Sequence, residues 1–141
     1  MKSLCLIMPV IIALLTSTIA CTGGTKVSEG LLAPPETIVR QADDGKVFKL
    51  RKGDEIVIHL KGNRTTGYSW AIEEVDDNVL GLVNDVYIPD KPTMTGSGGV
   101  WTITFKAVSV GASPVRLKYW RPWEGESSVV ERFEVTVRVG E

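Results

Sequence analysis

The chain has 141 residues and a formal net charge of −1, with acidic and basic residues interspersed along its length. This length suits one domain rather than two. The charge balance excludes the basic stripe or high isoelectric point typical of nucleic-acid-binding proteins, so no nucleic-acid partner is expected. Both cysteines, Cys5 and Cys21, precede the expected domain, which excludes a disulfide framework, a thiolate metal site and a cysteine nucleophile there.

The first 20 residues are typical of a signal peptide. A positive start, Met1-Lys2, is followed by the apolar run "LCLIMPVIIALL" and then by "TSTIAC". The uninterrupted apolar run is short for a membrane span and has the length of a signal-peptide core. We predict cleavage after Ala20, which makes Cys21 the first residue of the exported chain.

A small residue directly before Cys21 resembles the lipobox of bacterial-type lipoproteins, in which the cysteine thiol is diacylated. Thr18 departs from that pattern, which usually has Leu there, and ordinary signal-peptidase cleavage after Ala20 is the alternative. Residues 21–36 are rich in Gly, Pro and small polar residues and are predicted to be a flexible tether. We expect a protein that is lipid-anchored outside the cytoplasmic membrane, in the periplasm or at the cell surface, or otherwise secreted. The membrane is expected as a partner only through the lipid on Cys21.

Residues 37–141 are predicted to form one all-β domain. Apolar and polar residues alternate with period two, the pattern of half-buried strands, and no segment shows a helical period. About seven strands in roughly 100 residues predict an immunoglobulin-like antiparallel β-sandwich, in which Trp70 is the buried tryptophan. We expect the fourth strand to bend at Gly81. The predicted strands are residues 46–51, 55–60, 68–74, 79–88, 101–108, 114–119 and 132–139.

The domain offers little for catalysis. His59 is the only histidine, and it alternates with Ile58 and Leu60, so we expect it on the opposite face of its strand. A hydrolase would have to combine a serine with this one histidine, which makes that alternative remote. No His or Cys cluster has metal-ligand spacing, and "GSGG" lacks the ending of a phosphate-binding loop. We therefore expect neither an enzyme nor a bound cofactor or metal.

Three connections do not resemble ordinary turns. The Thr loop (residues 62–68, "GNRTTGY") carries short hydroxyl side chains, the Gly loop (88–101) contains "GSGG", and the Trp loop (120–128) contains "RPW". Alternate connections of an antiparallel sandwich emerge at the same end, so all three are expected at one tip. Threonine hydroxyls donate and accept hydrogen bonds, glycines permit close backbone approach, and Trp and Arg are enriched in interface hot spots.

The three loops resemble the motifs of the chagasin family, protein inhibitors of papain-like cysteine proteases. The family motif NPTTG[FY] is similar to "NRTTGY", GxGG to "GSGG", and RP[WF] to "RPW", in the same order and with similar spacing. The resemblance covers about residues 46–139. Arg64 is the departure, because the family has Pro there.

The resemblance implies a reversible, non-covalent inhibitor whose three loops enter the active-site cleft of a papain-like cysteine protease. It implies that the Thr loop approaches the catalytic cysteine, that the Gly loop follows the non-primed side, and that Trp123 stacks on a primed-side aromatic residue. We expect a monomer. The alternative is an immunoglobulin-like surface-binding or adhesion module that uses the same loops for another partner. The implied protease-binding residues are Asn63, Arg64, Thr65, Thr66, Gly67, Tyr68, Gly96, Ser97, Gly98, Gly99, Arg121, Pro122 and Trp123.

Overall fold

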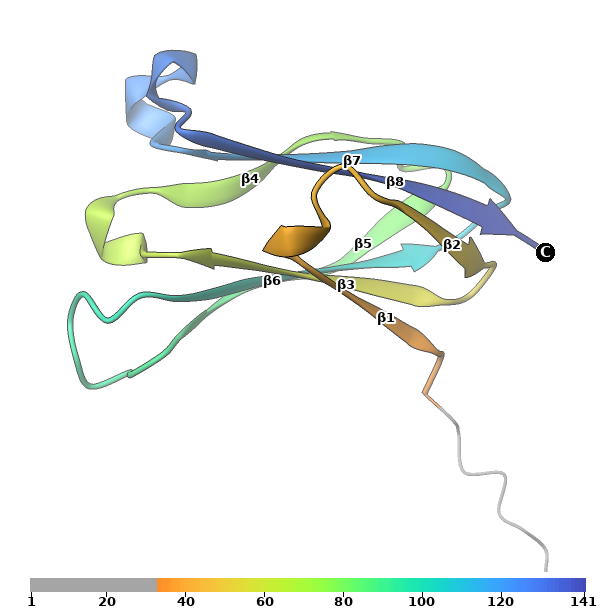
Figure 1. The fold of residues 1–141 in the computed structure, drawn as a ribbon, viewed down its shortest axis with the longest axis horizontal. Helices are drawn as coiled ribbons and strands as arrows, with labels where there is room; N and C mark the ends of the chain where they lie inside the picture. The colour runs from red at the N-terminus through yellow and green to blue at the C-terminus, as the bar shows by residue number, and fades with distance from the viewer. Residues whose placement is uncertain (1–32) are drawn as a thin grey trace, which may run out of the picture. The chain divides into compact units, whose positions relative to one another are not determined.

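A computed structural model describes residues 33–141, and it confirms an all-β sandwich of two facing sheets (Figure 1). The predicted signal peptide, Cys21 and the tether up to residue 32 lie outside the described residues. Sheet A has the strand order β1 (Glu36–Arg40), β3 (Glu55–Gly62), β6 (Gly99–Ala107) and β5 (Leu80–Pro89). Sheet B has the order β2 (Val47–Arg51), β8 (Glu131–Gly140), β7 (Gly111–Trp120) and β4 (Ser69–Val75).

All seven predicted strands are present, as β2 to β8, and β1 is an eighth that the sequence pattern did not reveal. Its five residues, "ETIVR", bury only Val39, so the alternation is too short to stand out. β1 pairs in parallel with β3, and β2 pairs in parallel with β8. Each sheet therefore has one parallel strand pair, at one edge, and all its other strand pairs are antiparallel. The 3-10 turn η1 (Gln41–Asp43) carries the chain from sheet A to sheet B between these two edges.

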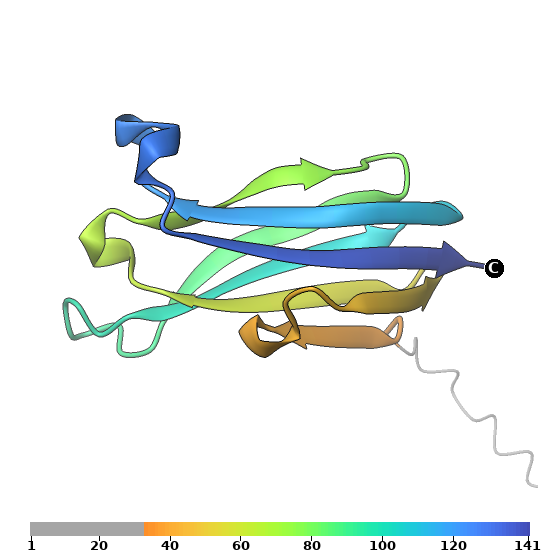
Figure 2. The same ribbon diagram turned by 45° about the horizontal axis from the view of Figure 1, so that its top comes forward.

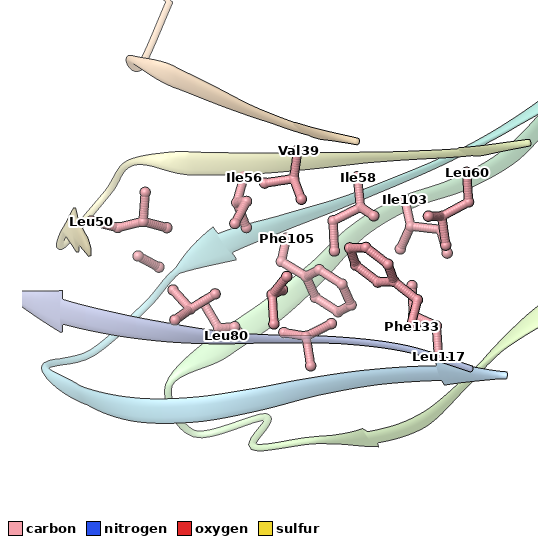
Figure 3. Packing of buried hydrophobic residues seen from close by; sticks show 14 of the residues in the cluster. Val39, Leu50, Ile56, Ile58, Leu60, Leu80, Ile103, Phe105, Leu117 and Phe133 are labelled. Atoms are coloured by element: carbon pink, nitrogen blue, oxygen red, sulfur yellow. The ribbon is translucent and has the colours of Figure 1, made fainter. Parts of the chain in front are cut away.

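The core lies between the sheets, and it contains the residues that the alternation places inward (Figure 3). Trp70 is buried, as predicted from its position on the third predicted strand. Thr104 is an exception, because alternation places it on the outer face of sheet A, yet it is buried. Thr104 is buried because β6 is a central strand of sheet A. Its neighbours on the two flanking strands, Val57 on β3 and Asn84 on β5, cover it from both sides. The largest fully buried side chains include Phe105, Phe133, Ile56, Ile58, Leu60, Leu80, Ile103 and Leu117.

The Thr, Gly and Trp loops all emerge at one end of the sandwich, as predicted (Figures 1 and 2). The start of β1 lies at the other end, because Glu36 pairs with Glu55 at the beginning of β3 while the Thr loop follows the end of β3. The helices among the described residues are single 3-10 turns, and none has the length and apolar character to cross a membrane.

Strand β5 is an edge strand that exposes several apolar side chains, among them Val83 and Ile88. Its irregularity lies between Leu82 and Asn84, just beyond the bend expected at Gly81. Asp85 pairs directly with the buried Ile103, so this carboxylate stands on the inner face of sheet A at its rim. A bulge and an inward-pointing charge are both features that discourage a second chain from pairing with an exposed edge.

Asp85→Asn tests the electrostatic consequence of this placement. Partial burial raises the pKa of Asp85 above its ordinary value of 3.8. The unfolded chain therefore loses this proton at lower pH than the folded chain, and stability falls as pH rises through that interval. We expect Asp85→Asn to match the wild type near pH 3 and to be slightly more stable at pH 7, with the gain kept small by solvent screening. Urea denaturation across this pH range measures it, and a less stable variant at pH 7 would contradict the assignment.

Candidate functional site

Asn63 organises the Thr loop from within. Its side-chain Oδ1 accepts hydrogen bonds from the backbone N of Thr65 at 3.0 Å and from the Thr65 hydroxyl at 2.6 Å, which caps the 3-10 turn η2 (Arg64–Thr66). The Thr66 hydroxyl donates to the backbone oxygen of Asn63 at 2.6 Å. Each threonine hydroxyl thus donates its only proton within the loop. Toward a binding partner it can act only as a hydrogen-bond acceptor. The exposed tip of the loop is Arg64, Thr65 and Thr66.

Gly67 closes the turn and touches the Trp loop. Its φ of +83° is a left-handed conformation that glycine adopts without strain. A Cβ atom there would lie 2.7 Å from Cζ2 of Trp123, so the indole rests directly on the Gly67 backbone. Trp123 nevertheless exposes 70% of its surface, which makes it the most exposed of the large hydrophobic side chains in residues 33–141. The Thr and Trp loops therefore form one continuous surface.

Arg121 joins the same two loops. Its Nε donates to the backbone oxygen of Thr66 at 3.2 Å, and its guanidinium lies 4.4 Å above the ring of Tyr68. A further pair with Glu124 at 3.1 Å stays within the Trp loop. Tyr68 is half-buried beneath this guanidinium. Arg121 and Tyr68 were predicted to bind a protease, and in the structure these two residues connect the Thr and Trp loops to each other.

Two residues that the sequence analysis did not single out hold the Trp loop: Ser128 closes the loop on itself, and Glu126 ties it to sheet B. Ser128 is buried, and its hydroxyl accepts from the backbone N of Arg121 at 3.0 Å and donates to the oxygen of Gly125 at 2.7 Å. Glu126 pairs with Lys118 and with Arg132, each at 2.6 Å. The hydrogen bond from Lys118 lowers the pKa of Glu126, so this carboxylate stays ionised under mildly acidic conditions. Nothing in "GESS" distinguishes these residues from solvated loop residues.

The Gly loop is attached to the Thr loop through Asn63, whose Nδ2 donates to the backbone oxygen of Gly96 at 3.2 Å. The hydroxyl of Ser97 accepts from the backbone N of Lys91 at 3.3 Å and so folds the loop onto itself. Gly99 is buried, and a Cβ there would lie 2.7 Å from the ring of Tyr87. Gly99 is therefore required by the packing of β6, whereas Gly96 is exposed at the tip.

His59 lies outside the three motifs, on the outer face of sheet A as expected. It is half-buried in the floor of an open groove, and its Nδ1 is 3.1 Å from the hydroxyl of Thr102. No serine lines this groove. Within residues 33–141 no group of three His, Cys, Asp or Glu side chains is arranged to hold a metal ion.

The fold and the three joined loops define an immunoglobulin-like sandwich that presents a composite loop surface at one end. Residues 49–137 match the model of the chagasin family, peptidase inhibitor I42, and the chain belongs to this family. It is 31% identical to chagasin of Trypanosoma cruzi over 104 residues, which cover 71% of this chain and 94% of chagasin. It is 38% identical to amoebiasin-1 of Entamoeba histolytica over 84 residues, which cover 57% and 78% of the two chains.

A solved structure has the same architecture. The crystal structure of a cysteine protease inhibitor from Entamoeba histolytica superposes with a TM-score of 0.65 at 25% identity, and the match covers 75% of this chain and 96% of that one. The prediction of an immunoglobulin-like sandwich and the resemblance to the chagasin family are both confirmed.

Gly67→Ala tests the contact between the Thr and Trp loops. A left-handed alanine costs about 1–2 kcal/mol of stability, and its methyl group must also displace the indole of Trp123. We expect lower thermal stability and a shifted indole N–H resonance of Trp123, assigned by its loss in Trp123→Phe.

Gly45→Ala is the matched control, because Gly45 has a φ of +80° and open space where a Cβ would lie. It should lose similar stability and leave the Trp123 resonance in place. If the Trp123 indole N–H resonance of Gly67→Ala also stays at its wild-type position, the indole does not rest on Gly67 in solution.

Proposed function

We propose that this protein is a reversible, non-covalent inhibitor of papain-like cysteine proteases that inserts its three loops into the active-site cleft. The observation that carries the proposal is that the three motif loops, from three separate strand connections, contact one another and form one surface on a chain of the chagasin family. The solved relative from Entamoeba histolytica is itself a cysteine protease inhibitor. Family membership also places the chain among inhibitors and not among enzymes.

The geometry of the Thr loop fits a blocking role. The tip residues Thr65 and Thr66 are short enough for a narrow cleft, and their hydrogen bonds to Asn63 hold the backbone in a tight turn. A loop that is already ordered loses little conformational entropy when it binds. The domain contains no cysteine, and the tip presents threonine hydroxyls whose protons are already engaged. Inhibition would therefore work by excluding the substrate, without a covalent bond to the protease.

The Gly and Trp loops would flank this tip on either side. The exposed backbone around Gly96 suits main-chain contacts along the non-primed side, and the exposed face of Trp123 suits stacking on an aromatic residue of the primed side. Arg64 adds an exposed positive charge at the tip, where the family has proline. One copy of the chain supplies all three loops, so a monomer would be complete as an inhibitor.

Trp123→Ala tests the proposal at its most exposed aromatic residue. We expect the affinity for papain to fall by about 2 kcal/mol or more, as is typical of an aromatic hot spot, with little change in thermal stability. Titration of papain with the purified domain measures the inhibition constant.

The control is Val110→Ala, which trims an exposed apolar side chain at the opposite end and should inhibit like the wild type. A wild-type domain that leaves papain fully active would favour the adhesion module. Unchanged inhibition by Trp123→Ala, together with a large loss of stability, would place this indole in the core.

We also propose that Cys21 is lipidated and anchors the inhibitor outside the cytoplasmic membrane. The support is the signal-like segment before Cys21 and the entry of the described chain at the end opposite the three loops. The interval from Cys21 to Glu36 can extend over at most about 50 Å. The tether would therefore join the domain at the end opposite the three loops and limit how far the domain reaches from the membrane.

Cys21→Ala tests the anchor in the native host. We expect the domain to leave the membrane fraction, or its precursor to accumulate unprocessed, because the acylated thiol is gone. Cell fractionation followed by intact-mass analysis measures both outcomes. An unmodified Cys21 in the wild-type protein would contradict lipidation and support ordinary signal-peptidase cleavage.

A further inference from the structure

We infer that Tyr119, a core-facing residue of β7, is the positioning residue that sets the Thr loop and couples it to the Trp loop. This inference rests on the proposed inhibitory function. Tyr119 stands outside the three motifs, and the alternation of β7 identifies it only as an inward-facing aromatic side chain. It is half-buried, at the end of the core that lies beneath the loops.

The hydroxyl of Tyr119 binds Asn63, the residue that organises the Thr loop. It accepts a hydrogen bond from the backbone N of Asn63 at 2.9 Å. The other polar groups of Asn63 are engaged further out, with Thr65, Thr66 and Gly96. A single hydroxyl in the core is therefore connected, through one residue, to the tip of the Thr loop and to the Gly loop.

The ring of Tyr119 extends the same connection to the Trp loop. It packs against Tyr68 with a centroid distance of 5.2 Å, and Tyr68 carries the guanidinium of Arg121. It also packs against Trp70 at 5.1 Å and Trp101 at 6.2 Å, from strands of both sheets. Tyr119 thus contacts both sheets and the Thr loop directly, and it reaches the Trp loop through Tyr68.

The position of the hydroxyl is tightly constrained. At Gly62, where β3 ends, a Cβ atom would lie 2.7 Å from the ring of Trp101 and 3.2 Å from the ring of Tyr119. The rings therefore pack directly against the last backbone unit before Asn63. With phenylalanine the ring could stay in place, but the half-buried N–H of Asn63 would lose its partner. The loop would then populate other conformations, and the apparent affinity would fall with the competent fraction.

The test compares Tyr119→Phe with two matched variants. We expect Tyr119→Phe to raise the inhibition constant for papain about five- to tenfold, the equivalent of one net hydrogen bond. Tyr87→Phe removes a hydroxyl from a tyrosine that packs on Trp101 at 4.4 Å beneath the Gly loop, and it should inhibit almost like the wild type.

Ser113→Ala controls for lost stability. The Ser113 hydroxyl accepts from the backbone N of Asp76 at 2.9 Å, the same type and length of bond, at the opposite end of the sandwich. It should lower the melting temperature about as much as Tyr119→Phe while leaving papain inhibition unchanged. Amide exchange of Thr65 and Thr66 in the free protein should accelerate in Tyr119→Phe and not in Ser113→Ala.

The outcomes separate the two proposals. A wild-type domain that does not inhibit papain overturns the inhibitory function itself. If the wild type inhibits but Tyr119→Phe inhibits equally well, or if Ser113→Ala weakens inhibition as much, Tyr119 is an ordinary core residue. A higher inhibition constant with unchanged exchange of the Thr65 amide would also exclude positioning of the Thr loop.

Discussion

The hydrogen bond from the backbone of Asn63 to the Tyr119 hydroxyl is the point at which the loop surface is tied to the core. Outward from it, Asn63 caps the Thr loop and holds the Gly loop. Inward from it, the Tyr119 ring packs among aromatic residues from both sheets. The surface proposed to bind a protease is therefore an extension of the core, and its shape depends on how the two sheets are packed.

A joined surface behaves differently from three independent loops. Arg121 bridges the Trp and Thr loops, Asn63 bridges the Thr and Gly loops, and the Trp123 indole covers Gly67. Substitutions in different loops should therefore not act additively, because residues that share partners are energetically coupled. Such joining also reduces the ordering that binding requires, which matters more for affinity than additional contact area.

The sequence predicted the parts of this structure that follow from periodicity and from contiguous motifs. Alternation placed Phe105 and Phe133 in the core, and the rule that alternate strand connections emerge at the same end placed the three loops together. It missed β1, since a five-residue edge strand with one buried side chain has almost no periodic signal. It also missed Ser128 and the bridging role of Arg121. Both depend on hydrogen bonds between positions whose proximity only the folded backbone determines.

The parallel pairing of β1 with β3 determines how the domain responds to mechanical tension. A pull on the chain ahead of Glu36 acts along β1, so the five positions paired with β3 are strained together in shear, instead of opening one after another. A partner held by the Thr loop would pull at the other end of that same strand, β3. The line of force would then run through the β1–β3 pair at one edge of sheet A, and the contacts between the two sheets would carry little of it.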